Sequence, residues 1–272
     1  MKIKIGVTGK ENGNVTSALL RRGAIHLDCD ITDDDAIEDV LERERPDIII
    51  NAASKTSVDW CDKKENNKEL FSVNIKGAYS LASKASFMKI PVVALSTDHV
   101  FDGKRGPYKE KYLKTLPVNQ YGISKFAMEG FRLAFDNFKV IRTSNLFWKD
   151  DERVTWYFEE AYRNEKVPVP IFQKRSFMHI EHFVDALLVY IENYKSMPKL
   201  LNISGRETVN YYAFVKAFAE AIDFPFVYKF KKNWFETGKF PAKRPKKAGL
   251  NTELSARLGI PQYSYVDGLK IL

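Results

Sequence analysis

The chain has 272 residues and only two cysteines, Cys29 and Cys61. Two cysteines cannot build the disulfide framework of a small secreted domain, and neither has the neighbours typical of a metal site. We therefore expect two reduced thiols, a cytoplasmic location and no bound metal.

Long apolar runs are also missing. No stretch approaches the ~18 consecutive apolar residues of a membrane span. The first residues, Met1-Lys-Ile-Lys-Ile-Gly, indicate a short strand that meets a glycine, and they lack the apolar stretch of a signal peptide. These absences predict a protein with no membrane partner. The sequence shows no internal repeat and no low-complexity tract.

Acidic residues are fewer than basic ones, which gives a formal net charge of +8. Lysines and arginines concentrate between residues 229 and 247. Three interpretations are open: a nucleic-acid surface, a site for anionic small molecules, and a generally basic surface. Because no zinc finger, RNA-recognition signature or heptad repeat accompanies the charge, we expect no nucleic-acid partner.

Apolar segments alternate with amphipathic ones through the first half of the chain. Strands are predicted at 3–5, 24–29, 47–53, 91–96 and 140–144, with helices between them. Those helices include one that Thr32 can cap, one around 68–88 and one over about 122–135. This alternation is typical of an α/β fold with a doubly wound parallel sheet. The rhythm changes after Phe147, where helices near 154–165, 181–193 and 210–222 are separated by proline-bearing segments. We expect residues 148–272 to form mostly a smaller C-terminal lobe, with segments that return to the sheet.

Two signals in the middle of the chain indicate proton-transfer chemistry. Ser96-Thr97-Asp98 follows a buried strand, and Tyr121-Gly-Ile-Ser-Lys125 opens a helix. Residues four apart share one face of a helix, so Tyr121 and Lys125 should project together. A neighbouring ammonium would lower the pKa of the tyrosine from about 10, which would make it a usable acid near neutral pH.

These signals belong to a larger pattern. The segments that carry it are Pro46-Asp-Ile-Ile-Ile-Asn-Ala-Ala53, Val58-Asp59, Val73-Asn74, Thr97-Asp-His-Val-Phe-Asp-Gly103, Gly106-Pro-Tyr-Lys-Glu110, Pro117-Val-Asn-Gln-Tyr-Gly-Ile-Ser-Lys125, Arg244-Pro245 and Leu250-Asn-Thr252. Together they resemble the extended short-chain dehydrogenase/reductases, and within them the dTDP-4-dehydrorhamnose reductase branch.

The resemblance implies a Rossmann-like NAD(P)-binding domain over residues 1–147 and a substrate-binding lobe over 148–272. It also implies an NAD(P)-dependent oxidoreductase that reduces a nucleotide-linked 4-keto-6-deoxy sugar. In that reaction Tyr121 protonates the carbonyl oxygen, Thr97 hydrogen-bonds the same oxygen, and Lys125 holds the nicotinamide ribose.

The glycine turn after the first strand is irregular. The family usually has Gly-x-x-Gly-x-x-Gly, whereas this chain has one more residue between Gly9 and Gly13 and places Thr16 third. Such a turn lets backbone N–H groups approach a pyrophosphate at a helix N-terminus, here at Asn14 and Val15.

Further residues are expected along the cofactor. An acidic residue about ~20 positions after the glycines often binds the ribose 2′-hydroxyl, and Asp28 and Asp30 both qualify. Arg21 and Arg22 could instead meet a 2′-phosphate, so the choice between NAD and NADP stays open with a lean to NAD. By the resemblance, the remaining cofactor-binding residues are Ile31, Ala52, Ala53, Ser54 and Asn74.

Four residues are candidates for the substrate: Asp98, His99, Asn145 and Arg244. His99 and Asn145 depart from the branch, which usually carries tyrosine and tryptophan there. Many epimerases and dehydratases of the wider family have asparagine at the second position. Arg244 resembles the C-terminal arginine that meets the nucleotide diphosphate, and its alternative is a solvated arginine in a basic stretch.

Two alternatives to the reductase remain open at this stage. One is a nucleotide-sugar epimerase or dehydratase, although the dehydratases' Asp-Glu pair is absent at Asp98-His99. The other is a non-catalytic nucleotide-binding regulatory subunit, because a fold alone does not fix a function. For each of these interpretations, the expected assembly is a homodimer.

Overall fold

The computed structural model describes residues 3–112, 115–233 and 241–272. Its centre is a six-stranded parallel sheet with the strand order β10-β5-β4-β3-β1-β2. The strands are β1 (Ile5–Thr8), β2 (Ile25–His26), β3 (Ile48–Asn51), β4 (Val92–Thr97), β5 (Phe138–Thr143) and β10 (Leu200–Asn202). This sheet confirms the predicted Rossmann-like α/β fold.

Helices cover both faces of the sheet because its strands are apolar on both sides. Ile48 and Ile50 of β3 pack with α1 (Asn14–Arg21) and α9 (Ile180–Glu192), while Ile49 faces the opposite layer. That layer consists of α2 (Asp34–Glu44), α5 (Ala78–Phe87) and α6 (Gln120–Glu129). A continuous apolar strand is the pattern expected of a parallel sheet buried on both faces.

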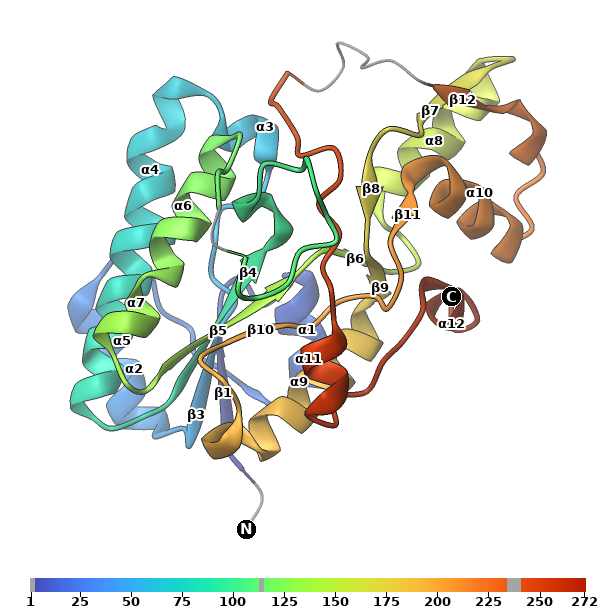
Figure 1. Cartoon of the computed structure of the whole chain (residues 1–272). Coiled ribbons are helices and arrows are strands. Elements are labelled where there is room, and N and C mark those ends of the chain that lie inside the picture. The colour runs from blue at the N-terminus through green and yellow to red at the C-terminus, as the bar shows by residue number, and fades with distance from the viewer. Residues whose placement is uncertain (1–2, 113–114, 234–240) are drawn as a thin grey trace.

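The second lobe has its own aromatic core. It contains α8 (Glu152–Arg163), α10 (Tyr211–Ala221) and α12 (Tyr265–Leu269), with three short strand pairs at its inner side. Those pairs are formed by β6 (Asn145–Phe147), β7 (Val167–Pro170), β8 (Lys174–Arg175), β9 (Phe177–His179), β11 (Val209–Asn210) and β12 (Phe230–Asn233). Figure 1 shows this lobe beside the sheet lobe, with the sheet helices α4, α5, α6 and α7 on the far side. The exact division at residue 147 stays a prediction.

A segment near the C-terminus runs between the lobes. We call residues 241–251 the strap. Lys247 N donates to Gly103 O at 2.7 Å and Lys174 N donates to Lys246 O at 2.7 Å, so the strap is hydrogen-bonded on both sides. Gly103 has φ +73° and an added Cβ would lie 2.4 Å from Lys246 N, so only glycine allows this approach. Figure 1 shows the strap as the red segment crossing the middle of the molecule.

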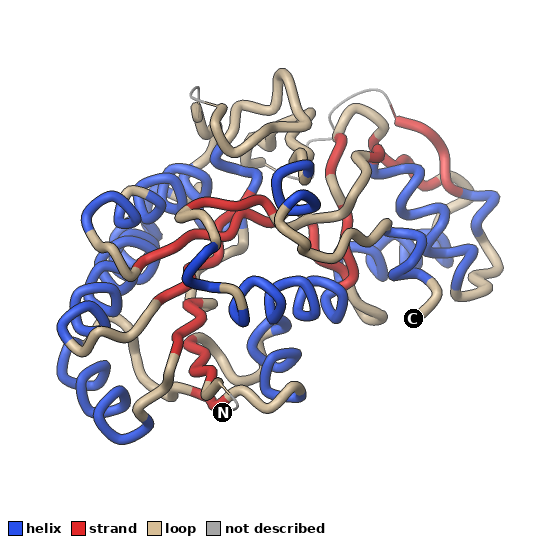
Figure 2. The backbone as a smooth tube through the Cα atoms, turned by 60° about the horizontal axis from the view of Figure 1, so that its bottom comes forward, coloured by secondary structure: helices blue, strands red, loops and turns tan. Residues whose placement is uncertain are grey.

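The predicted helices differ from the observed ones in detail. The helix expected at 122–135 is divided into α6 and α7 (Phe131–Ala134) at Gly130. The helix expected at 68–88 begins as α4 (Asn67–Phe71), continues through a π-helical turn at 72–77 and ends as α5. The short helices α3 (Val58–Cys61) and α11 (Glu253–Arg257) complete the set. Figure 2 shows the helices surrounding the strands of the sheet lobe.

One predicted helix cap was wrong. Thr32 was expected to cap α2, but the N-cap is Asp33, whose Oδ1 accepts from Asp35 N at 3.0 Å and Ala36 N at 3.1 Å. Thr32 instead donates its backbone and side-chain hydrogens to Asp30 Oδ1, at 2.9 and 2.8 Å. The carboxylate two residues earlier therefore competes successfully for the threonine.

Candidate active site

A long cleft of about 1510 Å³ follows the carboxyl ends of β1, β3 and β4. Ligands of open α/β sheets bind at this edge, where the loops after the strands diverge. Most of the predicted cofactor residues line it: Gly9, Gly13, Asn14, Val15, Asp30, Ile31, Ala52, Ala53, Ser54, Tyr121 and Lys125. The fold thus brings residues separated by more than a hundred positions to one cavity.

The irregular glycine turn keeps the geometry of a phosphate-binding turn. Gly9 has φ +110°, and a Cβ there would lie 3.1 Å from Ala53 N, so the turn packs against the end of β3. Gly13 precedes α1 as its N-cap, and no acidic residue occupies the first turn. The first turn of any helix leaves N–H groups without intrahelical acceptors. Together with the helix dipole, those groups favour an anion at this end of the cleft.

The acidic and basic residues near β2 lie in two different places. Asp28 and Asp30 line the cleft. Arg21 and Arg22 do not line it, because both pair with Glu181 of α9, at 2.5 and 3.2 Å. Arg22 also pairs with Asp185 at 2.6 Å. The expected alternative, in which these arginines meet a 2′-phosphate, is therefore not supported by their position.

Asn74 lies outside the cleft lining, and its amide is fully occupied inside the protein. Its Oδ1 accepts from Lys55 N at 2.8 Å and from Ser54 Oγ at 3.1 Å. Its Nδ2 donates to Lys55 O at 3.0 Å and to Ser124 Oγ at 2.9 Å. The amide thus fixes the end of β3 to α6, and the prediction that Asn74 itself touches the cofactor is not supported.

Tyr121 and Lys125 line the long cleft, and Thr97 is buried at the end of β4. Tyr121 lies in the first turn of α6, close to the Thr97 side chain, and its ring packs edge to face with that of His99. Lys125 follows one turn later, and its Nζ donates to Leu95 O at 2.9 Å. Thr97 Oγ1 also accepts from His99 N at 3.2 Å. The fold thus brings Tyr121 and Lys125 to one cleft, and the proton-transfer role of these residues with Thr97 stays a prediction.

The expected effect of Lys125 on Tyr121 was wrong. Burial raises the pKa of the Tyr121 phenol above its usual value, and the nearby Asp98 carboxylate raises this pKa further. Burial also lowers the pKa of Lys125 to about 8. Because the Lys125 ammonium is directed to the Leu95 carbonyl, desolvation outweighs any stabilisation of a phenolate.

Asp98 and His99 are buried, so their predicted contact with substrate is not supported. Asp98 Oδ2 accepts from Ser144 Oγ at 2.6 Å and lies 3.5 Å from Arg175 Nε. His99 Nδ1 lies 3.1 Å from Asn119 Nδ2, and burial lowers its pKa well below the usual value. Both side chains are therefore held inside the protein, directly behind Tyr121.

The other two substrate candidates, Asn145 and Arg244, do not line the long cleft. Asn145 begins β6 and is partly exposed, and it lines neither the long cleft nor the cavity described next. Arg244 lies on the strap and pairs with Asp59, with Nη2–Oδ2 at 2.6 Å and Nη1–Oδ1 at 3.0 Å. Their contacts with substrate stay predictions.

Arg244 opens onto a second cavity of about 1070 Å³ between the strap and the second lobe. Its walls combine aromatic and basic side chains, which are Trp156, Tyr157, Phe172, Lys104, Lys166, Lys243, Lys246 and Lys247. Part of the basic stretch noted in the sequence, residues 234–240, lies outside the described residues. In the sequence, the feature nearest to this cavity is the concentration of lysines and arginines between residues 229 and 247.

The second-lobe wall of the long cleft was missed by sequence reasoning. Trp148 and Arg153 line it after β6. The Arg153 guanidinium is held by Asp151, with contacts at 2.8 and 2.5 Å, and lies 5.4 Å from the centre of the Trp148 ring. Asp151 is almost fully buried, so this arginine is fixed in place. The rule that ligands bind beyond the carboxyl ends of strands could have drawn attention to these residues.

Neither metal-binding clusters nor membrane-spanning helices occur among the described residues. No group of three or more potential metal-ligating histidine, cysteine or carboxylate side chains occurs among them. Within the same part of the chain, no helix is long and apolar enough to span a bilayer.

The fold and the site define a Rossmann-like α/β protein with a cleft at the carboxyl edge of its parallel sheet. The chain belongs to the RmlD substrate binding domain family, whose model matches residues 4–271.

Individual relatives agree with this assignment over different lengths. A dTDP-4-dehydrorhamnose reductase of Sinorhizobium fredii is 36% identical over 156 residues, which are 52% of this chain and 50% of that protein. The chain thus spans about half the length of that curated relative. Methionine adenosyltransferase 2 subunit beta of Bos taurus is 24% identical over 244 residues, 85% of this chain and 71% of that protein.

A solved structure shows the same fold over the whole chain. The dTDP-4-dehydrorhamnose reductase of Bacillus anthracis, determined in complex with NADP, superimposes with a TM-score of 0.88 at 23% identity. The alignment covers 100% of this chain and 98% of that one.

Proposed function

We propose that the protein is an NAD(P)-dependent reductase of a nucleotide-linked 4-keto-6-deoxy sugar. The observation that carries this proposal is that Tyr121 and Lys125 line the same cleft as the glycine turn before α1. A nicotinamide dinucleotide supplies hydride chemistry when bound. Gly9, Gly13 and the start of α1 suit its pyrophosphate, and Lys125 suits the nicotinamide ribose.

The chain's own residues supply the proton. The Tyr121 phenol donates its proton to the carbonyl oxygen of the substrate and recovers one from solvent after the product leaves. Because burial raises its pKa, this phenol is protonated at neutral pH, which is the form required of an acid. Thr97 lies close to the phenol and can orient it, and Asp98 and Asn119 hold Thr97 and His99 in place.

The second cavity suits the nucleotide end of the substrate. Its aromatic side chains can stack on a base, and its lysines together with Arg244 attract a diphosphate. Arg244 is the strongest candidate for the diphosphate because its planar guanidinium can bind two phosphate oxygens at once. Binding energy from this remote group can orient the sugar at Tyr121.

The lean towards NAD also has structural support. Asp28 and Asp30 put carboxylates in the cleft near β2, where they suit a ribose 2′-hydroxyl and repel a 2′-phosphate. The two nearest arginines are engaged by α9 instead.

One observation favours the non-catalytic alternative. The relative that aligns over 85% of the chain is named as a subunit of methionine adenosyltransferase. A subunit of that kind would need the cleft for binding alone, whereas this chain also has Tyr121 and Lys125 in the lining of the cleft and Thr97 buried at the end of β4. The epimerase or dehydratase alternative is weaker, because the residue after Asp98 is the buried His99 and offers no second carboxylate.

A direct assay tests the proposal. The purified protein is mixed with NADH or NADPH and a dTDP-4-keto-6-deoxyhexose, and loss of the reduced nicotinamide is followed together with the sugar product. Turnover with either cofactor is the expected result. Tight binding of cofactor without turnover on any keto sugar would favour the regulatory subunit.

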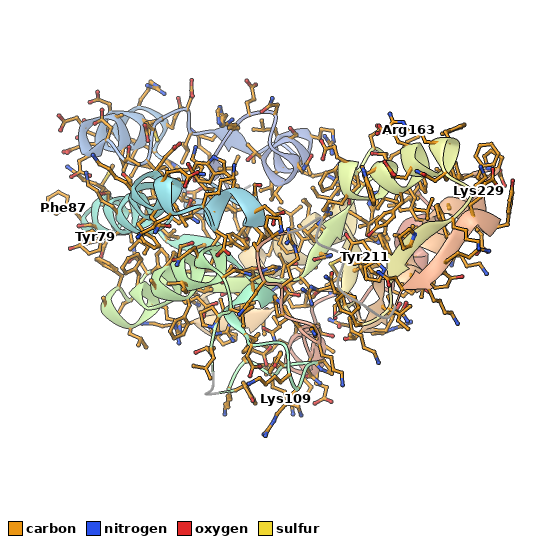
Figure 3. The ribbon with its side chains drawn as sticks, turned by 90° about the horizontal axis from the view of Figure 1, so that it is seen from above. Tyr79, Phe87, Lys109, Arg163, Tyr211 and Lys229 are labelled. Atoms are coloured by element: carbon orange, nitrogen blue, oxygen red, sulfur yellow. The ribbon has the colours of Figure 1, made fainter. Side chains whose placement is uncertain are left out.

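We also propose that the protein forms a homodimer in the cytoplasm. Helices α5, α6 and α7 expose large apolar side chains, which are Tyr79, Phe87, Ile123, Phe126 and Leu133. Phe87 is 89% exposed and Leu133 79%. Figure 3 shows Tyr79 and Phe87 at the edge of the sheet lobe farthest from the second lobe. A helix face this apolar is normally covered by a partner.

The assembly has its own test. Phe87→Asp and Leu133→Asp together should convert the dimer to a monomer in analytical ultracentrifugation. A wild-type chain that sediments as a monomer at all concentrations would remove this proposal, and cell fractionation checks the location.

A further inference from the structure

Asp59 and Arg244 are separated by 185 positions in the chain, yet they form a two-point ion pair. Asp59 belongs to the short helix α3, and Arg244 belongs to the strap. Asp59 Oδ1 also accepts from Ala242 N at 3.1 Å, and Arg244 Nη1 donates to Ala242 O at 3.0 Å. The carboxylate thus fixes both the guanidinium and the backbone that carries it.

The next residue of the strap is fixed from the opposite direction. Asn119 Nδ2 donates to Lys243 O at 2.8 Å. The same side chain caps α6, because its Oδ1 accepts from Gly122 N at 2.8 Å. Helix α6 carries Tyr121 and Lys125. The place of Arg244 is therefore set relative to the reactive residues through α3 and α6 together.

Helix α3 lies between the two cavities. Ser57 and Trp60, on either side of Asp59, line the long cleft, whereas Arg244 lines the second cavity. The Arg244 side chain is 18% exposed and that of Asp59 is 31% exposed, so the pair is partly shielded from water. Shielding and two-point geometry make such a contact more directional than an exposed ion pair.

We propose that Asp59 is a positioning residue, which holds the Arg244 guanidinium at the wall of the second cavity so that it can bind the diphosphate of a nucleotide. This inference rests on the proposed function, because it assigns the second cavity to the nucleotide end of the substrate. The opposite role is physically distinct. If Asp59 competed with a diphosphate for Arg244, removing its charge would tighten diphosphate binding, whereas loss of a positioning residue weakens it.

Calorimetric titration distinguishes weaker from tighter diphosphate binding, and it does not require turnover. Inorganic pyrophosphate and dTDP are titrated separately into wild type and Asp59→Asn, and NADH is titrated into both as a reference. We expect Asp59→Asn to weaken dTDP about tenfold through loss of the oriented fork. NADH affinity should change less than twofold. Unchanged or tighter dTDP binding in the variant would overturn the proposal. A wild-type protein that binds neither pyrophosphate nor dTDP would also overturn it.

Two further variants exclude a general loss of structure. Glu253→Gln is the matched control, because it removes a carboxylate that also ties the C-terminal segment to the loop after β4, through Lys109 at 2.9 Å. That pair is exposed, so wild-type binding is expected. Arg244→Lys keeps the charge without the fork. Adding Asp59→Asn to Arg244→Lys should weaken dTDP less than twofold further, and an additive tenfold loss would contradict a role through Arg244.

The outcomes also separate this inference from the reductase proposal. If Asp59→Asn weakens dTDP but wild type reduces no keto sugar, Asp59 keeps its role and the reductase proposal fails. If wild type is a reductase, Asp59→Asn should raise KM for the nucleotide sugar about tenfold with kcat within about twofold. A reductase whose KM is unchanged in Asp59→Asn would leave the reductase proposal intact and remove this one.

Discussion

Lys125 Nζ donates to the backbone carbonyl of Leu95 at 2.9 Å, which ties helix α6 to strand β4 two residues before Thr97. The contact directs a buried ammonium towards the floor of the long cleft, one helical turn from Tyr121. Because burial disfavours the charged form, it lowers the pKa of Lys125 to about 8.

The lowered pKa of Lys125 predicts a pH-dependent affinity for the dinucleotide. A lysine loses its proton as the pH rises through its pKa, so the charged donor is present below about pH 8 and absent well above it. We expect the Kd of NADH, measured by fluorescence titration, to be flat at acidic pH and to rise about tenfold per pH unit above pH 8. Lys125→Met should bind NADH weakly with no such break. If the Kd of NADH still rises above pH 8 in Lys125→Met, the pH dependence belongs to another group.

Tyr121→Phe removes the proposed acid and keeps the ring. We expect kcat to fall by about 10²–10⁴-fold, the usual contribution of general acid catalysis, with the Kd of NADH within twofold of wild type. Steady-state kinetics and cofactor titration measure the two quantities separately. Tyr162→Phe is the control, because Tyr162 is 66% exposed on the second lobe and should turn over normally. A Tyr121→Phe variant that retains most of its rate would exclude this phenol as the acid.

Asp28 should contribute to the choice of cofactor. Its carboxylate lines the cleft next to β2, so replacing it with asparagine removes repulsion of a 2′-phosphate. We expect wild type to show a larger thermal shift with NADH than with NADPH, and Asp28→Asn to reduce that difference. A ligand at about 100 times its Kd adds ~2.7 kcal/mol of stability, so the shifts are measurable. Asp39→Asn, on the exposed side of α2, should keep the wild-type preference.

Two ion pairs should differ sharply in their effect on stability. Glu129 is fully buried and accepts from Arg142 at 2.8 and 2.6 Å and from Ser96 Oγ at 2.6 Å. Glu129→Gln leaves the Arg142 guanidinium without its counter-charge, which should cost about 3–5 kcal/mol of unfolding free energy. Glu38 pairs with Lys84 near the surface, and Glu38→Gln should cost at most about 1 kcal/mol. Urea unfolding of both variants measures the two losses of unfolding free energy. Equal losses would show that burial of the ion pair does not control its effect on stability.

Local sequence patterns predicted the strands of the sheet well, because the apolar pattern of each strand lies within a short segment. The apolar stretch around Ile48–Asn51 indicated a strand buried on both faces, and the four-residue spacing of Tyr121 and Lys125 placed them together on one helix. The pKa of Tyr121 could not be predicted from that spacing, because it depends on how deeply the helix N-terminus is buried.

Contacts between distant segments were the part that sequence reasoning could not reach. Nothing near Arg244 indicates that Asp59 is its partner, and nothing near Asp98 indicates that Arg175 and Ser144 enclose it. The prediction for Thr32 was wrong for a smaller reason: the adjacent Asp33 is a residue type preferred over threonine at an N-cap, so the cap lies one position later.

The strap has a consequence for how this protein can be divided. Although it follows α8 and α10 in the chain, its hydrogen bonds to Gly103, Gly106 and Tyr108 make it part of the wall of the sheet lobe. A single cut near residue 147 would therefore yield neither lobe intact, because the N-terminal piece would lack α9, β10 and the strap. A chimera that borrows the second lobe of a relative must exchange several separate segments, α12 among them, and keep α9, β10 and the strap of the original chain.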